Sequence, residues 1–212
     1  MLIIDAHLDL SWNALQWNRD LLLSVYTTRT LESVMPGKGR RLSTVALPEM
    51  RQGRIALSIV TMLARSTGRP VAHLDYATPM QSYGIAQGQL AYYRALEQLG
   101  DVRIISDLTG LDAHMAAWQA WEAHGASEST PPLGFVLSME GADPIQTPEQ
   151  LEPWHAAGLR LLGITHYGPG RYAGGTGTEL GLSSSGPALL QAMQRLGVLL
   201  DLTHCSDRAF WQ

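Results

Sequence analysis

The chain has 212 residues, of which 45% are hydrophobic and 16% are charged, and its formal net charge is −4 at pH 7. This composition supplies enough apolar residues for a core and excludes extended disorder. The chain has one lysine, Lys38, and no basic stripe, so nothing in it favours a nucleic acid or another polyanion as partner.

The N-terminus and the cysteine content bear on the compartment. The opening segment MLIIDAHLDLSW has no basic region, and Asp5 and Asp9 interrupt its apolar run, unlike a signal peptide. No run approaches the roughly 18 apolar residues of a membrane span. Cys205 is the only cysteine, which is compatible with a reducing cytosol. We therefore expect a soluble, cytoplasmic protein.

Six apolar segments have the character of buried parallel strands. They are nearly continuous in apolar residues rather than alternating, which is the pattern of strands covered on both faces. In chain order they span residues 2–9, 54–64, 102–106, 132–140, 159–166 and 198–204. Segments with helical character lie between them, and this alternation predicts an α/β fold with right-handed crossovers.

Local signals mark where several helices begin and end. The segment TPEQ predicts a helix start with Thr147 as N-cap and Gln150 completing a capping box. Residues 28–50 are expected to hold a short hairpin or strand, and residues 167–186 form a loop rich in Gly and Ser. Three helical segments end at a glycine suited to a left-handed conformation: Gly100, Gly158 and Gly197.

Four of the predicted strands end in side chains that bind metals or transfer protons. The first ends in His7 and Asp9, and later strands end at Glu140, His166 and His204. The carboxyl ends of parallel strands share one edge of a sheet, and in a barrel they converge on one mouth. His7 and Asp9 are two residues apart, so they face the same way in a strand. Imidazole and carboxylate ligands suit Zn²⁺, and a carboxylate can bridge two ions, so the pattern predicts a metal site.

Each of these residues taken alone has a simpler interpretation. An H-x-D pair occurs by chance, Glu140 suits a helix cap, and either later histidine suits a core; their joint placement at four strand ends favours the metal site. Cys205 follows His204 and is interpreted as a buried residue without a ligand role. The remaining histidines are interpreted as surface or structural residues: His73, His114, His124 and His155.

The segments that carry the candidate ligands resemble the membrane (renal) dipeptidase family of zinc peptidases, which has bacterial cytoplasmic members. DAHLDLSWNAL resembles the family's DGHNDLPW opening, and LSMEGADPI is similar to its IEGG strand end. LRLLGITHY resembles its RYLTLTH strand, and GLSSSGPALLQAMQRLGVLLDLTHCSD its block ending in DLSHxS. The matches run in order from residue 2 to about residue 207.

The resemblance implies a (β/α)₈ TIM-like barrel with two zinc ions at its C-terminal mouth, of which this chain covers about the first five βα units. Residues 1–212 would be the N-terminal part of a single metallo-dipeptidase barrel domain, with 102–106 as an extra strand. His7 and Asp9 would bind one zinc ion, Glu140 would bridge the pair, and His204 would bind the second. His166 would contact the substrate and stabilise its developing oxyanion.

The implied activity is zinc-dependent hydrolysis of dipeptides by a metal-bridging hydroxide. A further zinc-binding His and a substrate-binding Asp and Arg are expected beyond residue 212. The expected partner is a small dipeptide, with no nucleic acid and no membrane, and a homodimer stays open.

The sequence departs from the family beside the substrate. It has EGAD at 140–143 where many members have EGGH, and YGPG at 167–170 in place of an Asn-rich stretch with Trp, so the identity of the dipeptide stays open. Two other functions also stay open. One is another metallohydrolase of the amidohydrolase type, acting on a lactam, lactone or phosphoester, although such sites usually have H-x-H and a carbamylated lysine. The other is a catalytically inactive, truncated barrel used for binding.

Overall fold

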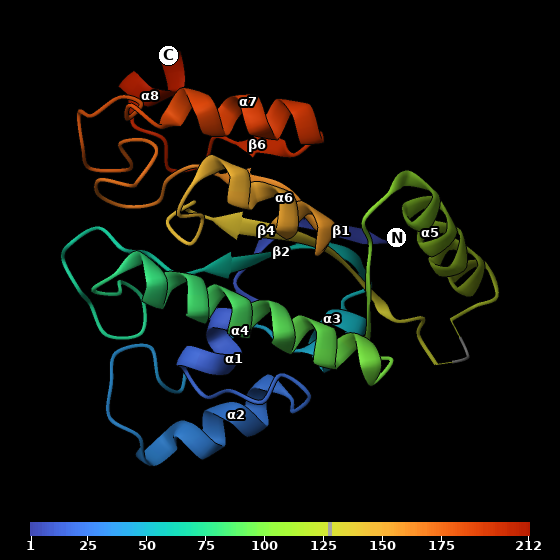
Figure 1. Cartoon of the computed structure of the whole chain (residues 1–212). Coiled ribbons are helices and arrows are strands. Elements are labelled where there is room, and N and C mark those ends of the chain that lie inside the picture. Colours follow the sequence, from blue (N-terminus) through green and yellow to red (C-terminus); the bar gives the residue numbers. More distant parts are fainter. Residues whose placement is uncertain (127–128) are drawn as a thin grey trace.

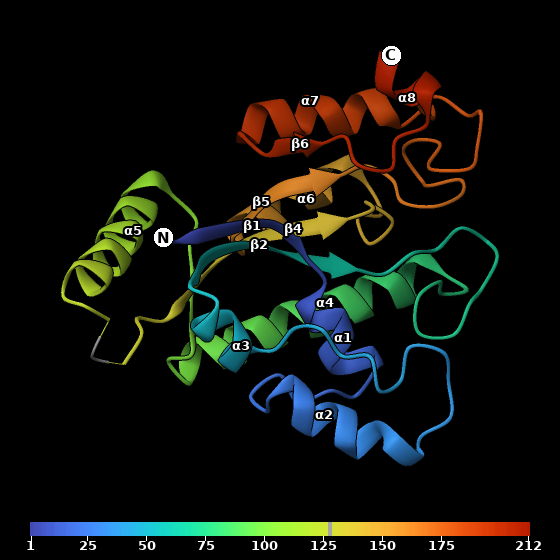
Figure 2. The ribbon, with the colours of Figure 1, turned by 180° about the vertical axis from the view of Figure 1, so that it is seen from behind.

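The computed structural model describes residues 1–126 and 129–212. Within these residues, six parallel strands form one sheet (Figures 1 and 2). They are β1 (Ile3–Leu8), β2 (Ile55–Leu63), β3 (Val102–Ile104), β4 (Leu133–Glu140), β5 (Leu159–Gly163) and β6 (Leu199–Asp201). Each lies inside one of the six predicted segments, and the predicted parallel α/β architecture is confirmed.

Strand β4 is the centre of the sheet. One of its edges pairs with β2 over residues 57–63. Its other edge is shared, because β3 pairs with residues 133–135 and β5 pairs with residues 137–140. The strand order is therefore β1-β2-β4-β5-β6, with β3 outside this path, as expected for an extra strand.

The helices that cover the sheet lie on one of its faces. In Figure 1 the helices α4, α6 and α7 lie in front of the strands, and in the reverse view of Figure 2 the strands lie in front of these helices. The α-helices of the described residues are α1 (Leu10–Gln16), α2 (Val25–Leu31), α3 (Leu47–Gln52), α4 (Pro79–Gln98), α5 (Leu108–Ala123), α6 (Leu151–Ala156), α7 (Gly186–Leu196) and α8 (Asp207–Trp211), and the 3₁₀ turns are η1 (Glu32–Val34) and η2 (Pro148–Gln150).

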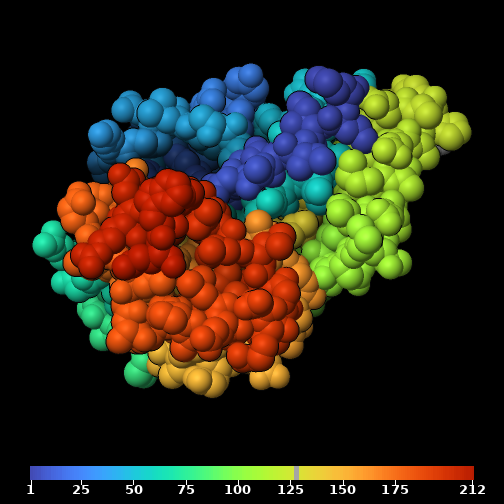
Figure 3. Space-filling model, turned by 90° about the horizontal axis from the view of Figure 1, so that it is seen from above, coloured from blue at the N-terminus to red at the C-terminus, as the bar shows by residue number. Residues whose placement is uncertain are grey.

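The two outer strands leave the sheet open. Ile4 of β1 is 60% exposed, and Leu199 of β6 is 63% exposed. A cavity of about 390 Å³ lies between these strands, with Ala6 and His7 on one side and Leu200 on the other. In Figure 3 the N-terminal residues (blue) and the C-terminal residues (red) border each other at the surface. The sheet is a half-barrel whose outer strands present unpaired backbone edges.

Helix α5 packs through a buried histidine. His114 is 1% exposed, and its Nε2 lies 2.7 Å from the carbonyl oxygen of Ala56 in β2. A Cβ atom at position 134 would lie 2.4 Å from this nitrogen, so the glycine there leaves room for the ring. His114 is thus structural, one of the two roles expected for it.

The predicted helix start at Thr147 is only partly right. The chain first forms the 3₁₀ turn η2 and then α6, and the Thr147 side chain makes no capping hydrogen bond. The Gln150 amide oxygen instead accepts from the backbone N–H of Gln146. A complete capping box stands at the start of α4, formed by Thr78 and Gln81. The predicted left-handed glycine is confirmed at Gly197, with φ 70°, after α7.

The expected hairpin or strand within residues 28–50 is wrong. This segment, all of it described, holds the end of α2, η1, an irregular loop and the start of α3. The buried carboxylate of Glu32 organises it, accepting from Arg19 Nε at 2.8 Å, Arg40 Nη1 at 2.8 Å and the Arg41 backbone N–H at 2.6 Å. Side-chain to backbone bonds of this kind replace the ladder that a hairpin would need. The hydrogen bond from Arg19 leads these contributions, which outweigh burial and lower the pKa of Glu32 to about 2.

Glu32→Gln is expected to destabilise the protein in a pH-dependent way. A folded pKa of about 2, below the ordinary 4.5, means that ionised Glu32 stabilises the fold above pH 4.5 and that this contribution is lost as the pH falls towards 2. The difference corresponds to about 3 kcal/mol. Urea unfolding at pH 7 and pH 2.5 measures this contribution. The difference in free energy of unfolding between wild type and variant should be about 3 kcal/mol at pH 7 and much smaller at pH 2.5. An equal gap at both values would contradict the assignment.

Candidate metal centre

All five candidate side chains lie at the carboxyl-terminal edge of the sheet. His7 lies in β1, Asp9 follows that strand as the N-cap residue of α1, and Glu140 is the last residue of β4. His166 and His204 lie in the loops after β5 and β6, because these strands end at Gly163 and Asp201, earlier than predicted.

The loop of residues 167–186, rich in Gly and Ser, hydrogen-bonds the backbone beside the two later histidines, and we call it the crossing loop. His204 has φ 68°, a left-handed conformation that is strained for a residue with a side chain and tends to occur at functional sites. The backbone N–H of Thr176 donates to the carbonyl oxygen of His166 at 3.0 Å, and that of Gly175 donates to the carbonyl oxygen of Gly168 at 2.8 Å. The Gly- and Ser-rich loop therefore fastens the backbone beside the site.

The candidate ligand atoms converge on the carboxylate of Glu140. Its Oε1 atom lies 3.5 Å from Nε2 of His7, 3.5 Å from Nε2 of His166 and 3.1 Å from Nε2 of His204. The Nε2 atom of His7 lies 3.7 Å from Oδ1 of Asp9. Among the described residues, two groups with ligand atoms within 4.8 Å of one another result: His7, Asp9 and Glu140; and Glu140, His166 and His204.

Burial differs across the site. The side chain of Glu140 is 8% exposed and that of His166 is 10% exposed, whereas those of His7 and Asp9 are 35% and 32% exposed. The Oε2 atom of Glu140 is buried without a hydrogen-bond partner among the described residues. A buried carboxylate oxygen without a partner is costly, so it points to a bound group that the residues themselves do not supply.

Burial and neighbouring charges shift the pKa values of the candidate side chains in opposite directions. The neighbouring carboxylates of Asp9 and Glu140, in that order, raise the pKa of His7 to about 10. Burial opposes ionisation of Asp9, but the contacts with His7 and Thr61 outweigh it and lower the pKa of its carboxyl group. Burial, followed by the charges of His204 and Arg65, lowers the pKa of His166 to about 4. His166 is therefore neutral at pH 7.

Several residues that support the site have no signal in the sequence. The Thr61 hydroxyl hydrogen-bonds Oδ1 of Asp9 from the neighbouring strand β2. The carbonyl oxygen of Thr61 accepts from the Tyr93 hydroxyl at 2.8 Å and from Ser11 Oγ at 3.0 Å. Such contacts orient a ligand side chain before it binds. Thr61 looks like any other strand residue in the sequence, and only its position opposite Asp9 distinguishes it.

Asp143, one of the two residues at which EGAD departs from the EGGH pattern, is 4% exposed. Its carboxylate accepts from the backbone N–H groups of Ser66 and Arg171, both at 2.9 Å, and burial raises its pKa. It thus ties the loop after β2 to the loop after β5.

The remaining candidates of the sequence analysis lie outside both ligand groups. Cys205 is half-buried rather than buried, and burial raises the pKa of its thiol. No described histidine other than His7, His166 and His204 contributes to either group.

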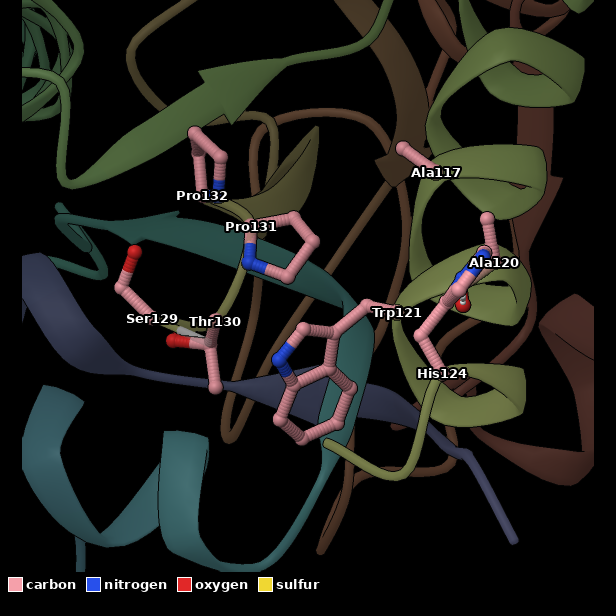
Figure 4. Close-up of a pocket in the computed structure, with 8 residues that line it drawn as sticks. All are labelled: Ala117, Ala120, Trp121, His124, Ser129, Thr130, Pro131 and Pro132. Atoms are coloured by element: carbon pink, nitrogen blue, oxygen red, sulfur yellow. Dashed lines mark hydrogen bonds between the residues drawn. The ribbon is translucent and has the colours of Figure 1, made fainter. Parts of the chain in front are cut away.

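A separate cavity of about 540 Å³ lies between Trp121 of α5 and Pro131, at the other end of the strands from Glu140 (Figure 4). It contains none of the candidate ligands.

Comparison with known families decides the relationship. Residues 1–212 match the family described as membrane dipeptidase, peptidase family M19. The chain belongs to this family. The resemblance found in the sequence is therefore confirmed, and the half-barrel is part of an M19 metallopeptidase fold.

Solved structures agree with this M19 fold. A dipeptidase AC, a metallo peptidase of family M19, superposes with a TM-score of 0.65 at 21% identity, over 99% of this chain and 58% of that one. A metallo peptidase from Rhodobacter sphaeroides, bound to a phosphinate mimic of the dipeptide L-Ala-D-Ala, gives a TM-score of 0.68 at 20% identity, over 99% and 60%. The probable dipeptidase PvdM from Pseudomonas aeruginosa gives 0.64 at 16%, over 100% and 48%. The M19 chain described here thus spans about half to three fifths of the length of these structures.

No helix in the part of the chain that the structure describes combines the length and the apolar character of a membrane span.

Proposed function

We propose that this chain carries the metal-binding part of a zinc-dependent dipeptidase. The observation that supports it is the convergence of two ligand groups on Glu140, at the carboxyl-terminal edge of a half-barrel that belongs to family M19. Ligands bind at this edge in parallel α/β folds.

The residues fit zinc by their chemistry and spacing. Imidazole nitrogens and carboxylate oxygens are common zinc ligands. Ligands at about 2.0–2.1 Å from a tetrahedral zinc ion lie about 3.3 Å from one another. The distances of 3.1–3.7 Å between the nitrogens and oxygens here are of this size. The Oε2 atom of Glu140 has no hydrogen-bond partner among the described residues, so this carboxylate would have an oxygen available for a metal ion.

We assign each side chain a role. His7 and Asp9 would hold one ion, His204 would hold the other, and Glu140 would be a ligand of both. His166 donates a hydrogen bond to the dipeptide carbonyl oxygen as negative charge develops on it. When bound, the two ions supply a water of lowered pKa and a Lewis acid for the amide.

We further propose that residues 1–212 are the N-terminal part of one barrel domain. The open edges of β1 and β6, with exposed Ile4 and Leu199, support this, as does the partial coverage of the solved M19 structures. Strands pairing with these edges would close the barrel. They would also bring the further His and the substrate-binding Asp and Arg expected from the family resemblance.

A dipeptide panel tests the proposed activity in the product of the complete reading frame. We expect hydrolysis of dipeptides of L-L and L-D stereochemistry, loss of activity on removal of metal, and recovery with zinc. Preferential hydrolysis of a lactam, lactone or phosphoester would instead assign a different amidohydrolase-type activity. Zinc binding without turnover of any substrate would favour a binding role. Full activity in metal-free protein would overturn the proposal.

The expected location and assembly stay predictions. We propose a cytoplasmic protein that works as a monomer or homodimer on a small dipeptide. Fractionation of cells and light scattering of the purified protein measure these two properties directly.

A further inference from the structure

The Nδ1 atoms of His166 and His204 have different hydrogen-bonding neighbours: a donor beside His166 and an acceptor beside His204. Nδ1 of His166 lies 3.3 Å from Nη1 of Arg65. A guanidinium group has donors only, so Nδ1 of neutral His166 must accept and carry a lone pair. The proton of the neutral ring is then on Nε2, the atom that points toward Glu140.

His204 has the reverse arrangement. Its Nδ1 lies 3.0 Å from the hydroxyl oxygen of Thr176, and the same hydroxyl lies 3.3 Å from the carbonyl oxygen of His204. The carbonyl oxygen only accepts, so it takes the single hydroxyl proton of Thr176. The oxygen of Thr176 then accepts from Nδ1–H of His204. This leaves the lone pair of neutral His204 on Nε2.

We propose that Arg65 and Thr176 are positioning residues that hold the two neighbouring imidazoles in opposite tautomers. Arg65 makes Nε2 of His166 a hydrogen-bond donor, and Thr176 makes Nε2 of His204 a free ligand. The two Nε2 atoms lie at similar distances from Glu140, 3.5 and 3.1 Å, so distance alone does not separate their roles. The neighbours at Nδ1, on the far side of each ring, separate the two roles. The expected effects on zinc binding and catalysis rest on the proposed function, whereas the contacts of the Nδ1 atoms do not.

The backbone of Arg65 is anchored by hydrogen bonds, and its guanidinium lies beside a buried counter-charge. Its Nε has no hydrogen-bond partner among the described residues. Its backbone N–H donates to Leu74, and its carbonyl oxygen accepts from the Tyr76 backbone and from Ser82 Oγ. The side chain is 11% exposed, and its Nε lies 3.5 Å from the carboxylate of Asp75, which is 2% exposed. Nη1 also donates to the carbonyl oxygen of Tyr167 at 3.3 Å. A group fixed by its backbone and by a buried counter-charge can select a tautomer instead of following it.

The direct test is the protonation of the ring nitrogens, observed by NMR of protein with ¹⁵N-labelled histidine. His→Gln variants assign the signals. In zinc-loaded protein we expect a proton on Nε2 of His166 and a proton on Nδ1 of His204, with the ¹⁵N shift of His204 Nε2 changed by the metal. The His166 signal is also read in metal-free protein, which keeps this arm independent of zinc binding. A proton on Nδ1 of neutral His166 overturns the proposal in either state.

Matched variants test each positioning residue. Arg65→Met removes the donor but keeps most of the side-chain stem, and we expect His166 to populate both tautomers while zinc affinity changes less than about 3-fold. Arg65→Lys retains a donor and should restore Nε2–H. In an active complete protein, Arg65→Met should lower kcat by about 100-fold with little change in KM, since the lost hydrogen bond acts in the transition state. A His166 tautomer that is unchanged in Arg65→Met contradicts the role of Arg65.

Thr176→Val removes the acceptor beside His204 at nearly constant volume, and Thr176→Ser retains it. We expect a 10–100-fold loss of zinc affinity in the first variant and near wild-type affinity in the second, measured by titration calorimetry with zinc chloride. Equal affinities in both variants contradict the role of Thr176. Failure of the proposed function has a different signature, because protein that binds no zinc and cleaves no dipeptide would still report the His166 tautomer.

Discussion

Glu140→Gln is expected to lower the affinity of this chain for zinc by at least about 100-fold and to abolish dipeptide hydrolysis in the complete protein. The carboxylate belongs to both ligand groups, so its replacement by a neutral amide removes the negative charge that both share and exchanges one of its two oxygens for an NH2 group that does not bind metal. Changes at residues that merely orient ligands already cost about 10–100-fold, and loss of a shared ligand should cost more. Titration calorimetry and metal analysis measure the binding.

The same variant has a second readout without metal. Glu140 is one of the two carboxylates that raise the pKa of His7 to about 10, and Asp9 is the other and larger cause. The pKa of His7 should therefore fall in Glu140→Gln but stay above 6.5, as measured by NMR titration. The exposed carboxylate of Glu152 in α6 provides a matched control, since Glu152→Gln should leave both zinc affinity and this pKa unchanged. Tight zinc binding by Glu140→Gln would refute the assigned centre.

Gly175→Ala is expected to destabilise the protein by about 3 kcal/mol and to weaken zinc binding as well. A Cβ atom at this position would lie 1.8 Å from the carbonyl oxygen of His166 and 2.6 Å from Oγ1 of Thr165. The first contact is with backbone, so the crossing loop has to move, and overpacking of this kind costs about 1–3 kcal/mol or more. Because Thr176 follows directly and contacts His204, the movement reaches the site.

Gly88→Ala is the control for this substitution. Gly88 lies on the exposed face of α4, and a Cβ atom there would meet nothing within 4 Å. Alanine favours a helix interior over glycine by about 0.5–1 kcal/mol, so this variant should be more stable than wild type. Urea unfolding compares the two variants. A Gly175→Ala variant as stable as wild type would contradict the close approach at Gly175, and a destabilised Gly88→Ala variant would contradict the open position of Gly88.

Many of the features predicted from the sequence depend on local patterns. Continuous apolar runs identified all six strands, because a buried strand needs apolar residues on both faces whatever its neighbours are. Local rules failed where a long-range contact intervened. The loop around Glu32 takes its form from two arginines, one of them 13 residues away, and Thr147 lost its capping role to the turn that precedes α6.

The candidate ligands could be named from the sequence because they follow apolar runs, and parallel strands deliver such positions to one edge. The apolar runs, the histidines and the acidic residues that follow them can all be identified in the sequence. Their distances to Glu140, and the lack of a partner for its Oε2 atom, required coordinates.

By itself, the sequence determined the class of fold, the positions of its strands along the chain and the residue types that follow them. Only the tertiary structure decided which neighbours orient those residues: Thr61 beside Asp9, Arg65 beside His166 and Thr176 beside His204. These pairs are 52, 101 and 28 residues apart. Hydrophobic periodicity acts over a few residues and specifies an element, whereas a hydrogen-bond partner at this separation depends on which strands and loops fold side by side.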